Sequence, residues 1–286
     1  MSLCFFITLI IQITPKKVIC PFIIPKRMSL LEEVREITVL PGTTKTGETE
    51  NFKEITIRPG DTVSIVGPTG SGKTALINDI EVFAQGDTVT GRKILVNGNV
   101  PPEEFVRDPA YKPIALITQN TKCLADLSVN DFLQMHITAR NSNEKGILER
   151  TIELANKFTG ESITAGNRMT SLSGGQTRSL MIADAMLISN APILLLDEIE
   201  NAGIFKDAVI KHLRKMNKAV IFVTHDPYIS LLSDRRIVMG NGAVRSVITP
   251  DGKESGALDK IRDMDKVMSE IREKIRIGET IDGGCI

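Results

Sequence analysis

The clearest chemistry in this sequence lies in a glycine-rich segment, SIVGPTGSGKTALI, which runs from Ser64 to Ile77. It joins an apolar run to an expected helix, and it contains the spacing GxxxxGK(S/T). Glycines allow backbone N–H groups to curl around phosphate oxygens, and the start of a helix adds its dipole. This pattern predicts a site for a nucleoside triphosphate, whereas the alternative is a tight structural turn. The predicted phosphate-binding residues are Gly67, Pro68, Thr69, Gly70, Ser71, Gly72, Lys73 and Thr74.

Two acidic residues at the end of an apolar run supply the second half of such a site. The run ILLLDE ends in Asp197 and Glu198, directly after the pattern of a buried strand. We expect Lys73 to bring charge to the outer phosphates and the Thr74 hydroxyl to ligate Mg²⁺. Asp197 can then hold Mg²⁺, directly or through water, while Glu198 orients the attacking water. The alternative for this acidic pair is an N-cap of a following helix.

A third motif, LSGGQ from Leu172 to Gln176, resembles the signature of the ATP-binding cassette (ABC) ATPases. The resemblance extends from about Glu33 to Val247 and rests on several short motifs in that family's order. In order they are the loop at 67–74, Gln119 at a strand end, the signature at 172–176, the acidic strand at 193–197, Glu198, and His225 after VIFVT.

The resemblance implies roles for residues outside the glycine-rich loop. Gln119 would reach Mg²⁺ and the attacking water, and His225 would contact the γ-phosphate. The alternatives are a surface turn for Gln119 and a structural role for His225, while His136 and His212 receive no role. Within the signature, the residues that would cap the γ-phosphate of ATP bound to a partner domain are Ser173, Gly174, Gly175 and Gln176.

The partner implied by this resemblance is a second copy of the chain. The helix that follows Ser173 can face a phosphate with its N-terminus, but the chain's own phosphates are already held by its loop. The sequence contains one set of motifs, so two chains are needed to complete each site. We therefore expect a head-to-tail homodimer, which closes by two-fold symmetry.

Composition sets limits on the class of protein. The 286 residues include 35 Lys and Arg and 35 Asp and Glu, which gives a formal net charge of zero. This balance gives no direct evidence for a nucleic-acid partner, because such proteins are commonly basic. The four cysteines form no CxxC pair and have no adjacent histidine cluster, which indicates a reducing compartment without structural zinc.

The first segment, residues 1–27, is apolar but is not expected to belong to the fold. Its apolar run from Leu3 to Ile13 is too short to span a bilayer, and no positive charge precedes it as in a signal peptide. We interpret 1–27 as a poorly ordered upstream extension; the alternative is a weak membrane anchor. No other segment approaches transmembrane length.

The elements that must position these motifs alternate along the chain. Continuous apolar strands between helices indicate a parallel sheet that is covered on both faces. Expected strands lie at 35–40, 54–57, 62–66, 92–98, 112–118, 192–198 and 219–225, and expected helices lie at 72–83, within 128–158, at 177–188, at 205–216 and from Ala257 onward.

The resemblance adds a domain plan to this pattern. It implies an α/β P-loop NTPase fold with a mostly parallel sheet, a small antiparallel β subdomain and an inserted helical subdomain. We expect the ATPase domain at 28–250, its helical subdomain at about 124–190, and an amphipathic helix and tail at 251–286. The spacing of that last helix favours packing on its own domain over a coiled coil.

Four segments depart from the family's pattern. The segment IENAGIF follows Glu198, and Asp184 stands where the family often has arginine. Residues 41–51 contain no aromatic residue to stack on adenine, and Phe52 looks like the opening of a strand. The polar segment RDPAYKP at 107–113 has no recognisable pattern. The nucleotide-hydrolysing core is complete despite these departures.

The leading hypothesis is an ATP-hydrolysing ABC subunit that drives transport through a separate membrane-spanning partner. That partner would dock a short helix beside Gln119 and the helices of 128–158, so the protein would be cytoplasmic or peripheral at the inner face of the cell membrane. One alternative is a soluble ABC ATPase that remodels a protein, nucleic acid or metallocofactor assembly. Another alternative is a nucleotide-gated binding module with little turnover. The presence of both Glu198 and His225 argues against it.

Overall fold

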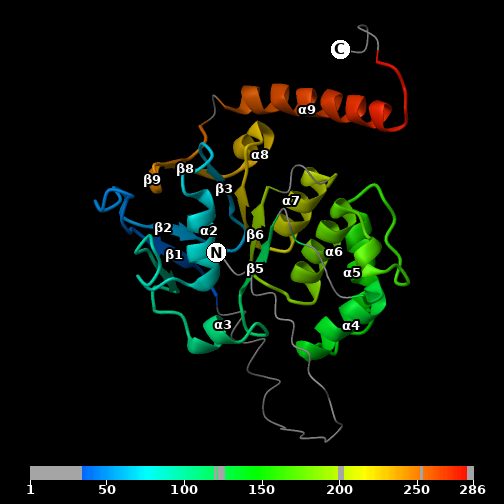
Figure 1. The fold of residues 1–286 in the computed structure, drawn as a ribbon, viewed down its shortest axis with the longest axis horizontal. Helices are drawn as coiled ribbons and strands as arrows, with labels where there is room; N and C mark the ends of the chain where they lie inside the picture. Colours follow the sequence, from blue (N-terminus) through cyan, green and yellow to red (C-terminus); the bar gives the residue numbers. More distant parts are fainter. Residues whose placement is uncertain (1–33, 119–120, 122–125, 199–202, 252–253, 282–286) are drawn as a thin grey trace, which may run out of the picture.

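The computed structural model describes residues 34–118, 121, 126–198, 203–251 and 254–281. The expected extension at 1–27 and the candidate residue Gln119 therefore lie outside the described residues. Within the described residues, a six-stranded sheet runs through the middle of the molecule, with helices on both of its faces (Figure 1). A smaller three-stranded sheet lies beside it.

The larger sheet is parallel except at one edge, as the sequence predicted. Its strands, in spatial order, are β5 (Ile114–Ile117), β6 (Ile193–Asp197), β7 (Ala219–Val223), β3 (Thr62–Val66), β8 (Arg235–Gly240) and the antiparallel β9 (Ala243–Ile248). The smaller sheet is antiparallel, in the order β2 (Ile55–Ile57), β1 (Ile37–Leu40) and β4 (Lys93–Val96).

The expected helices lie close to their predicted ranges, and they include the long helix at the C-terminal end. The helices of the described residues are α2 (Lys73–Val82), α3 (Glu103–Arg107), α4 (Val129–Ala139), α5 (Ile147–Asn156), the short 3₁₀ helix η1 (Met169–Ser171), α6 (Gly174–Leu187), α7 (Lys206–Lys215), α8 (Pro227–Leu232) and α9 (Ser255–Arg276).

The alternation of side chains along β6 shows how the sheet separates two hydrophobic cores. Leu194 and Leu196 are fully buried in the core that contains α4, α5, α6 and α7. Ile193 and Leu195 are fully buried in the other core, which contains α2 and the small antiparallel sheet. Because both faces of this strand are covered, its sequence is continuously apolar rather than alternating.

Several elements were not predicted from the sequence. They are α3, α8, β8 and β9, which together occupy short stretches without a clear apolar period. Strand β8 opens with Arg235 and Arg236, whose side chains form ion pairs with Asp61 and Glu254. Because of these two charged residues, the sequence pattern did not predict β8, which pairs with β3 in the sheet.

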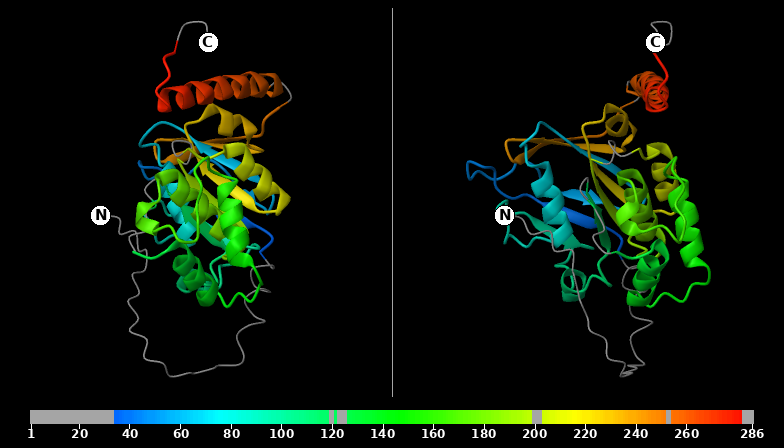
Figure 2. Two further views of the ribbon diagram at one scale, coloured as in Figure 1. Left: turned by 90° about the vertical axis from the view of Figure 1, so that its right-hand side faces the viewer. Right: turned by 45° about the vertical axis from the view of Figure 1, so that its right-hand side comes forward.

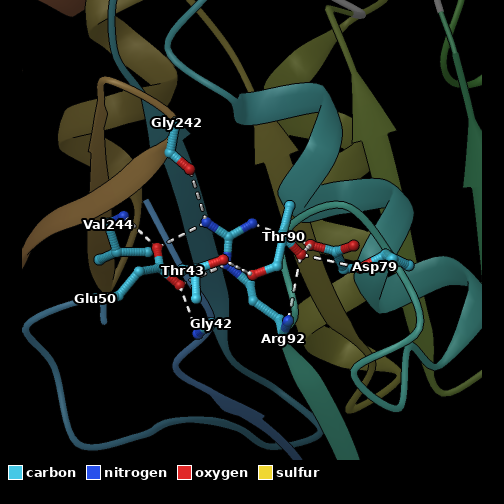
Figure 3. A network of polar contacts seen from close by, with 9 residues as sticks. Gly42, Thr43, Glu50, Asp79, Thr90, Arg92, Gly242 and Val244 are labelled. Carbon is cyan, nitrogen blue, oxygen red and sulfur yellow. Dashed lines mark hydrogen bonds and ion pairs between the residues drawn. The ribbon is translucent and has the colours of Figure 1, made fainter. Parts of the chain in front are cut away.

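A buried ion network ties the small sheet to the larger one (Figure 3). The Arg92 side chain is fully buried, and its guanidinium donates to both carboxylate oxygens of Glu50, at 2.7 and 2.8 Å. It also donates to Oδ2 of Asp79, at 3.0 Å. The Thr90 hydroxyl donates to the same Asp79 oxygen at 2.8 Å. All three charged groups therefore have hydrogen-bonding partners, as buried charges require.

The same network fixes backbone from three separate segments. The two Glu50 oxygens accept from Gly42 N at 3.0 Å and from Val244 N at 2.7 Å, while Arg92 donates to Gly242 O at 3.1 Å. Burial alone would raise the pKa of Glu50, but the hydrogen bonds from Arg92, Gly42 and Val244 hold that pKa below its ordinary value. Glu50 is therefore ionised wherever the protein is folded near neutral pH.

We predict that Arg92→Met lowers the free energy of unfolding by about 3–5 kcal/mol, because it leaves two buried carboxylates without their cation. Urea unfolding at neutral pH measures the loss. In the wild type, the lowered pKa means that Glu50 stabilises the fold above its unfolded pKa and loses this effect as the pH falls through the folded value. The gap between wild type and variant should therefore narrow below about pH 5.

The control for this experiment is Arg58→Met, which removes a surface pair. Arg58 forms an ion pair with Glu36 at 3.0 Å, but its side chain is 64% exposed. We expect a loss below about 1 kcal/mol. Equal losses in the two variants would show that the buried network has no special role in stability.

Candidate functional site

The candidate site lies at the carboxyl edge of the parallel sheet, where β3, β6 and β7 end next to one another. Val223 of β7 is in register with Ile65 of β3 on one side and with Asp197 of β6 on the other. The glycine-rich loop follows β3, Glu198 follows β6 and His225 follows β7. Ligands in open α/β sheets bind outside this edge. The fold thus brings together three motifs that are far apart in the sequence.

The glycines of the loop are required by close backbone contacts. A Cβ atom on Gly67 would lie 2.4 Å from the carbonyl oxygen of Met239. A Cβ on Gly72 would lie 2.9 Å from the Cα of Gly242, and Gly72 has a positive φ of 100°. The loop therefore packs directly on the β8–β9 turn, and α2 begins immediately after it at Lys73. This geometry leaves the first N–H groups of α2 at the open edge.

Two polar side chains inside the loop are suited to a bound anion. Lys73 is only 7% exposed, and its ammonium donates to Gly67 O at 2.7 Å and Pro68 O at 3.1 Å. The Ser71 hydroxyl is buried and has no hydrogen-bond partner among the described residues. Since a buried hydroxyl without a partner is costly, this orphaned donor fits a phosphate oxygen.

The carboxylate of Glu198 and the ring of His225 face one another across the ends of β6 and β7. Their Oε1 and Nε2 atoms are 3.6 Å apart. Glu198 has a φ of 49°, the left-handed region that a glutamate rarely adopts, and its N–H donates to Val223 O at 2.9 Å. This backbone costs about 1 kcal/mol or more and turns Glu198 out of the strand direction. Strain of this kind often marks a functional position.

The candidate metal ligands are placed on α2 and β6. Thr74 lies in the first turn of α2 and is exposed, while Asp197 is the half-buried last residue of β6. Their hydroxyl and carboxylate oxygens are the hard donors that Mg²⁺ prefers. The third candidate, Gln119, lies outside the described residues, and nothing is concluded about its position.

The signature residues form the start of α6. The Ser173 hydroxyl accepts from Gln176 N at 3.2 Å, and the Gln176 side chain accepts from Ser173 N at 2.9 Å, which together make a capping box. Gln176 also donates to Ser162 O at 3.0 Å. Helix α6 packs in the core on the opposite face of the sheet from α2 (Figure 1). The chain's own signature helix and the helix that follows its glycine-rich loop therefore pack on opposite faces of the sheet.

One departure from the family's pattern has a clear structural partner. Asp184 on α6 lies 2.9 Å from the Nδ1 atom of His136 on α4, and the His136 ring packs against Phe132. The two residues are 48 positions apart in the sequence, so no local signal could have predicted the pair. His136, which received no role from the sequence, joins two helices of the helical region.

Helix α9, which the sequence predicted, lies beside the candidate catalytic residues, and this position was not predicted. It lies across one end of the molecule next to α8 in the views of Figures 1 and 2. Lys206 at the start of α7 forms ion pairs with Asp226 and, at 3.3 Å, with Asp265 of α9. A pocket of about 440 Å³ lies here, and its lining includes Glu198, Lys206, His225, Tyr228, Met264 and Met268.

Two aromatic residues are candidates for stacking on adenine, and both are partly buried. Phe52 and Tyr111 both lie against the core that contains α2.

The segment after Glu198 begins outside the described residues, which resume at Gly203. Among the residues that the structure describes, no helix is both long and apolar enough to cross a membrane.

A mostly parallel sheet that ends in a glycine-rich loop and a helix is the architecture of the P-loop nucleotide hydrolases. Comparison with known proteins defines the family more closely. The model of the ABC transporter family matches residues 52–201. An uncharacterized ABC transporter ATP-binding protein of Methanocaldococcus jannaschii is 48% identical over 249 residues, which cover 87% of this chain and 95% of that relative.

More distant relatives agree with this assignment. The spermidine/putrescine import ATP-binding protein of Bacteroides fragilis is 29% identical, over 77% of this chain and 48% of its own length, so this chain spans about half of it. A solved dimeric ATP-binding cassette with bound ADP and phosphate has the same fold, with a TM-score of 0.56 at 24% identity, over 76% of this chain and 99% of that one.

The chain belongs to the ABC transporter family of ATP-binding proteins. It is an ATP-binding and ATP-hydrolysing protein of this family, as the resemblance of its motifs implied. The expected α/β fold of a P-loop NTPase is confirmed.

We predict that Gly67→Ala destabilises the protein more than Gly70→Ala does. A Cβ on Gly67 would strike a backbone oxygen, whereas a Cβ on Gly70 would meet nothing within 4 Å. Gly70→Ala should cost only the strain of its positive φ, about 1–2 kcal/mol, while Gly67→Ala adds about 1–3 kcal/mol of overpacking. Chemical unfolding measures both. Equal losses would contradict the close contact between the loop and β8.

Proposed function

We propose that this chain hydrolyses Mg²⁺-ATP at two sites shared between the subunits of a head-to-tail homodimer. The observation that carries the proposal is the meeting of the phosphate loop, Glu198 and His225 on one sheet edge. The signature helix of the same chain packs on the other face, so a second chain would supply the signature to each site. The solved relative that is a dimer with ADP and phosphate supports this arrangement.

In this proposal the loop binds the triphosphate. The N–H groups of 69–74 surround phosphate oxygens at the positive end of α2. Lys73 exchanges its two carbonyl partners for outer phosphate oxygens, and the Ser71 hydroxyl gains the acceptor that it lacks. Gly67, Pro68, Thr69, Gly70 and Gly72 contribute backbone and space rather than charge.

Hydrolysis requires a positioned water and a neutralised phosphate charge. Thr74 and Asp197 would hold Mg²⁺, which supplies positive charge to the phosphate oxygens. We assign Glu198 to orienting the attacking water and His225 to a hydrogen bond with the γ-phosphate. The 3.6 Å between Glu198 and His225 places both groups around one small volume. Gln119 is proposed, from the resemblance alone, to reach the metal and the water.

The partner's signature would complete the charge around the γ-phosphate. In each chain Ser173, Gly174, Gly175 and Gln176 present the first turn of α6, where the helix dipole favours an anion. The capping box holds this turn in shape before the partner arrives. ATP would thus join the two chains, and hydrolysis would release them.

The energy of this cycle would be passed to a separate membrane-spanning subunit. Import, the activity in the name of the relative from Bacteroides fragilis, needs a route through the bilayer. We propose that this subunit docks beside α4 and α5, which places the chain on the cytoplasmic side of the membrane. The cargo is determined by that subunit rather than by the ATPase.

We predict that Lys73→Ala abolishes ATP binding and turnover, because the loop loses its buried cation. Binding is measured with a fluorescent ATP analogue and turnover by phosphate release. Lys53→Ala removes an exposed lysine and serves as the control, with activity near that of the wild type. Near-normal hydrolysis by Lys73→Ala would contradict the assigned phosphate site.

We predict that Glu198→Gln binds ATP, hydrolyses it at least about a hundred-fold more slowly and accumulates as a dimer in Mg²⁺-ATP. Light scattering with and without Mg²⁺-ATP measures the change in mass. The control is Glu103→Gln on the exposed face of α3, which should turn over ATP normally and not accumulate as a dimer. A Glu198→Gln variant that stays monomeric at high concentration would argue against the homodimer.

A further inference from the structure

The hairpin that replaces the expected adenine platform presents a lysine to the phosphate loop. Residues 43–49 form a short hairpin, closed by a bridge between Thr43 and Thr49 and by a hydrogen bond from Thr44 N to Glu48 O. Lys45 lies near its tip, and its ammonium donates to Gly70 O at 3.2 Å. A second cation, besides Lys73, therefore reaches the loop from a separate segment.

The path of the Lys45 side chain depends on a glycine. A Cβ atom on Gly242 would lie 2.8 Å from Cγ of Lys45 and 3.2 Å from its Cε, so the methylene stem crosses the side-chain-free face of Gly242. Gly242 in turn contacts Gly72 and donates its N–H to Ser71 O at 2.9 Å. Lys45, Gly242 and the loop thus form one contact series.

The buried ion network holds both ends of this series in place (Figure 3). Glu50 binds the backbone of Gly42, at the base of the hairpin, and that of Val244, just after the turn. Arg92 binds the carbonyl of Gly242. A fully buried guanidinium and its carboxylate therefore set the position from which Lys45 approaches the loop. The backbone on both sides of the Lys45 contact is therefore fixed by buried hydrogen bonds.

We propose that Lys45 binds the phosphate oxygens of the nucleotide held in the glycine-rich loop. This inference rests on the proposed function, because it assumes that the loop binds a triphosphate. A lysine ammonium is a compact charge that binds phosphate without demanding a fixed geometry. Both Lys45 and Lys73 donate to loop carbonyls, and both can transfer these hydrogen bonds to phosphate oxygens, which are stronger acceptors.

The test measures dissociation constants of ATP and of inorganic tripolyphosphate for the full-length chain and its variants. Lys45→Gln should weaken both ligands by a similar factor of about ten. Lys45→Arg keeps the charge and should stay within about three-fold of the wild type. Lys53→Gln is the matched control, since this exposed lysine lies beyond the hairpin, and it should change neither constant. The thermal midpoints of all variants check that the fold is intact.

Each outcome distinguishes this inference from the proposed function. If Lys45→Gln weakens ATP alone, the lysine contacts the base or ribose and the inference is wrong. If it weakens neither ligand, the contact with Gly70 is only structural and the inference is also wrong. If the wild type itself binds neither ATP nor tripolyphosphate, the proposed function fails instead.

Discussion

The buried pairing of Arg92 with Glu50 and Asp79 is the interaction on which the geometry of the site depends. It joins the residue before β4, the hairpin after β1, α2 and the β8–β9 turn within one set of hydrogen bonds. Such a network is costly to desolvate and is stable only when every charge has partners. The backbone that the network binds includes Gly242, which packs against the glycine-rich loop, so the network helps to fix the position of that loop.

The second constraint is the parallel order of the central strands. Because β3, β7 and β6 are adjacent and point the same way, their carboxyl ends deliver the loop, His225 and Glu198 to one edge. The left-handed backbone at Glu198 is sustained by its hydrogen bond to Val223 within this sheet. A rigid sheet can hold a strained residue, and this backbone conformation sets the direction of the Glu198 side chain.

The placement of α9 connects the C-terminal helix to the same edge. Its Asp265 forms an ion pair with Lys206, and its Met264 and Met268 line the pocket that also contains Glu198 and His225. The helix therefore lies next to the residues to which we assign hydrolysis.

The sequence by itself determined the features that depend on neighbours in the chain. The glycine loop, the apolar strand before Asp197 and the capping box of Ser173 and Gln176 all involve residues within a few positions of each other. Helix α2 begins directly after its glycine, at Lys73, and the apolar strands lie within their predicted ranges, because backbone freedom and burial act locally.

Only the tertiary structure decided which distant charges meet. Arg92 pairs with Glu50, 42 positions away, and His136 pairs with Asp184, 48 positions away. With 35 basic and 35 acidic side chains, the sequence allows a very large number of such pairings. The choice among them follows from strand order and helix packing, since a buried ion pair forms only where the fold removes both groups from water together.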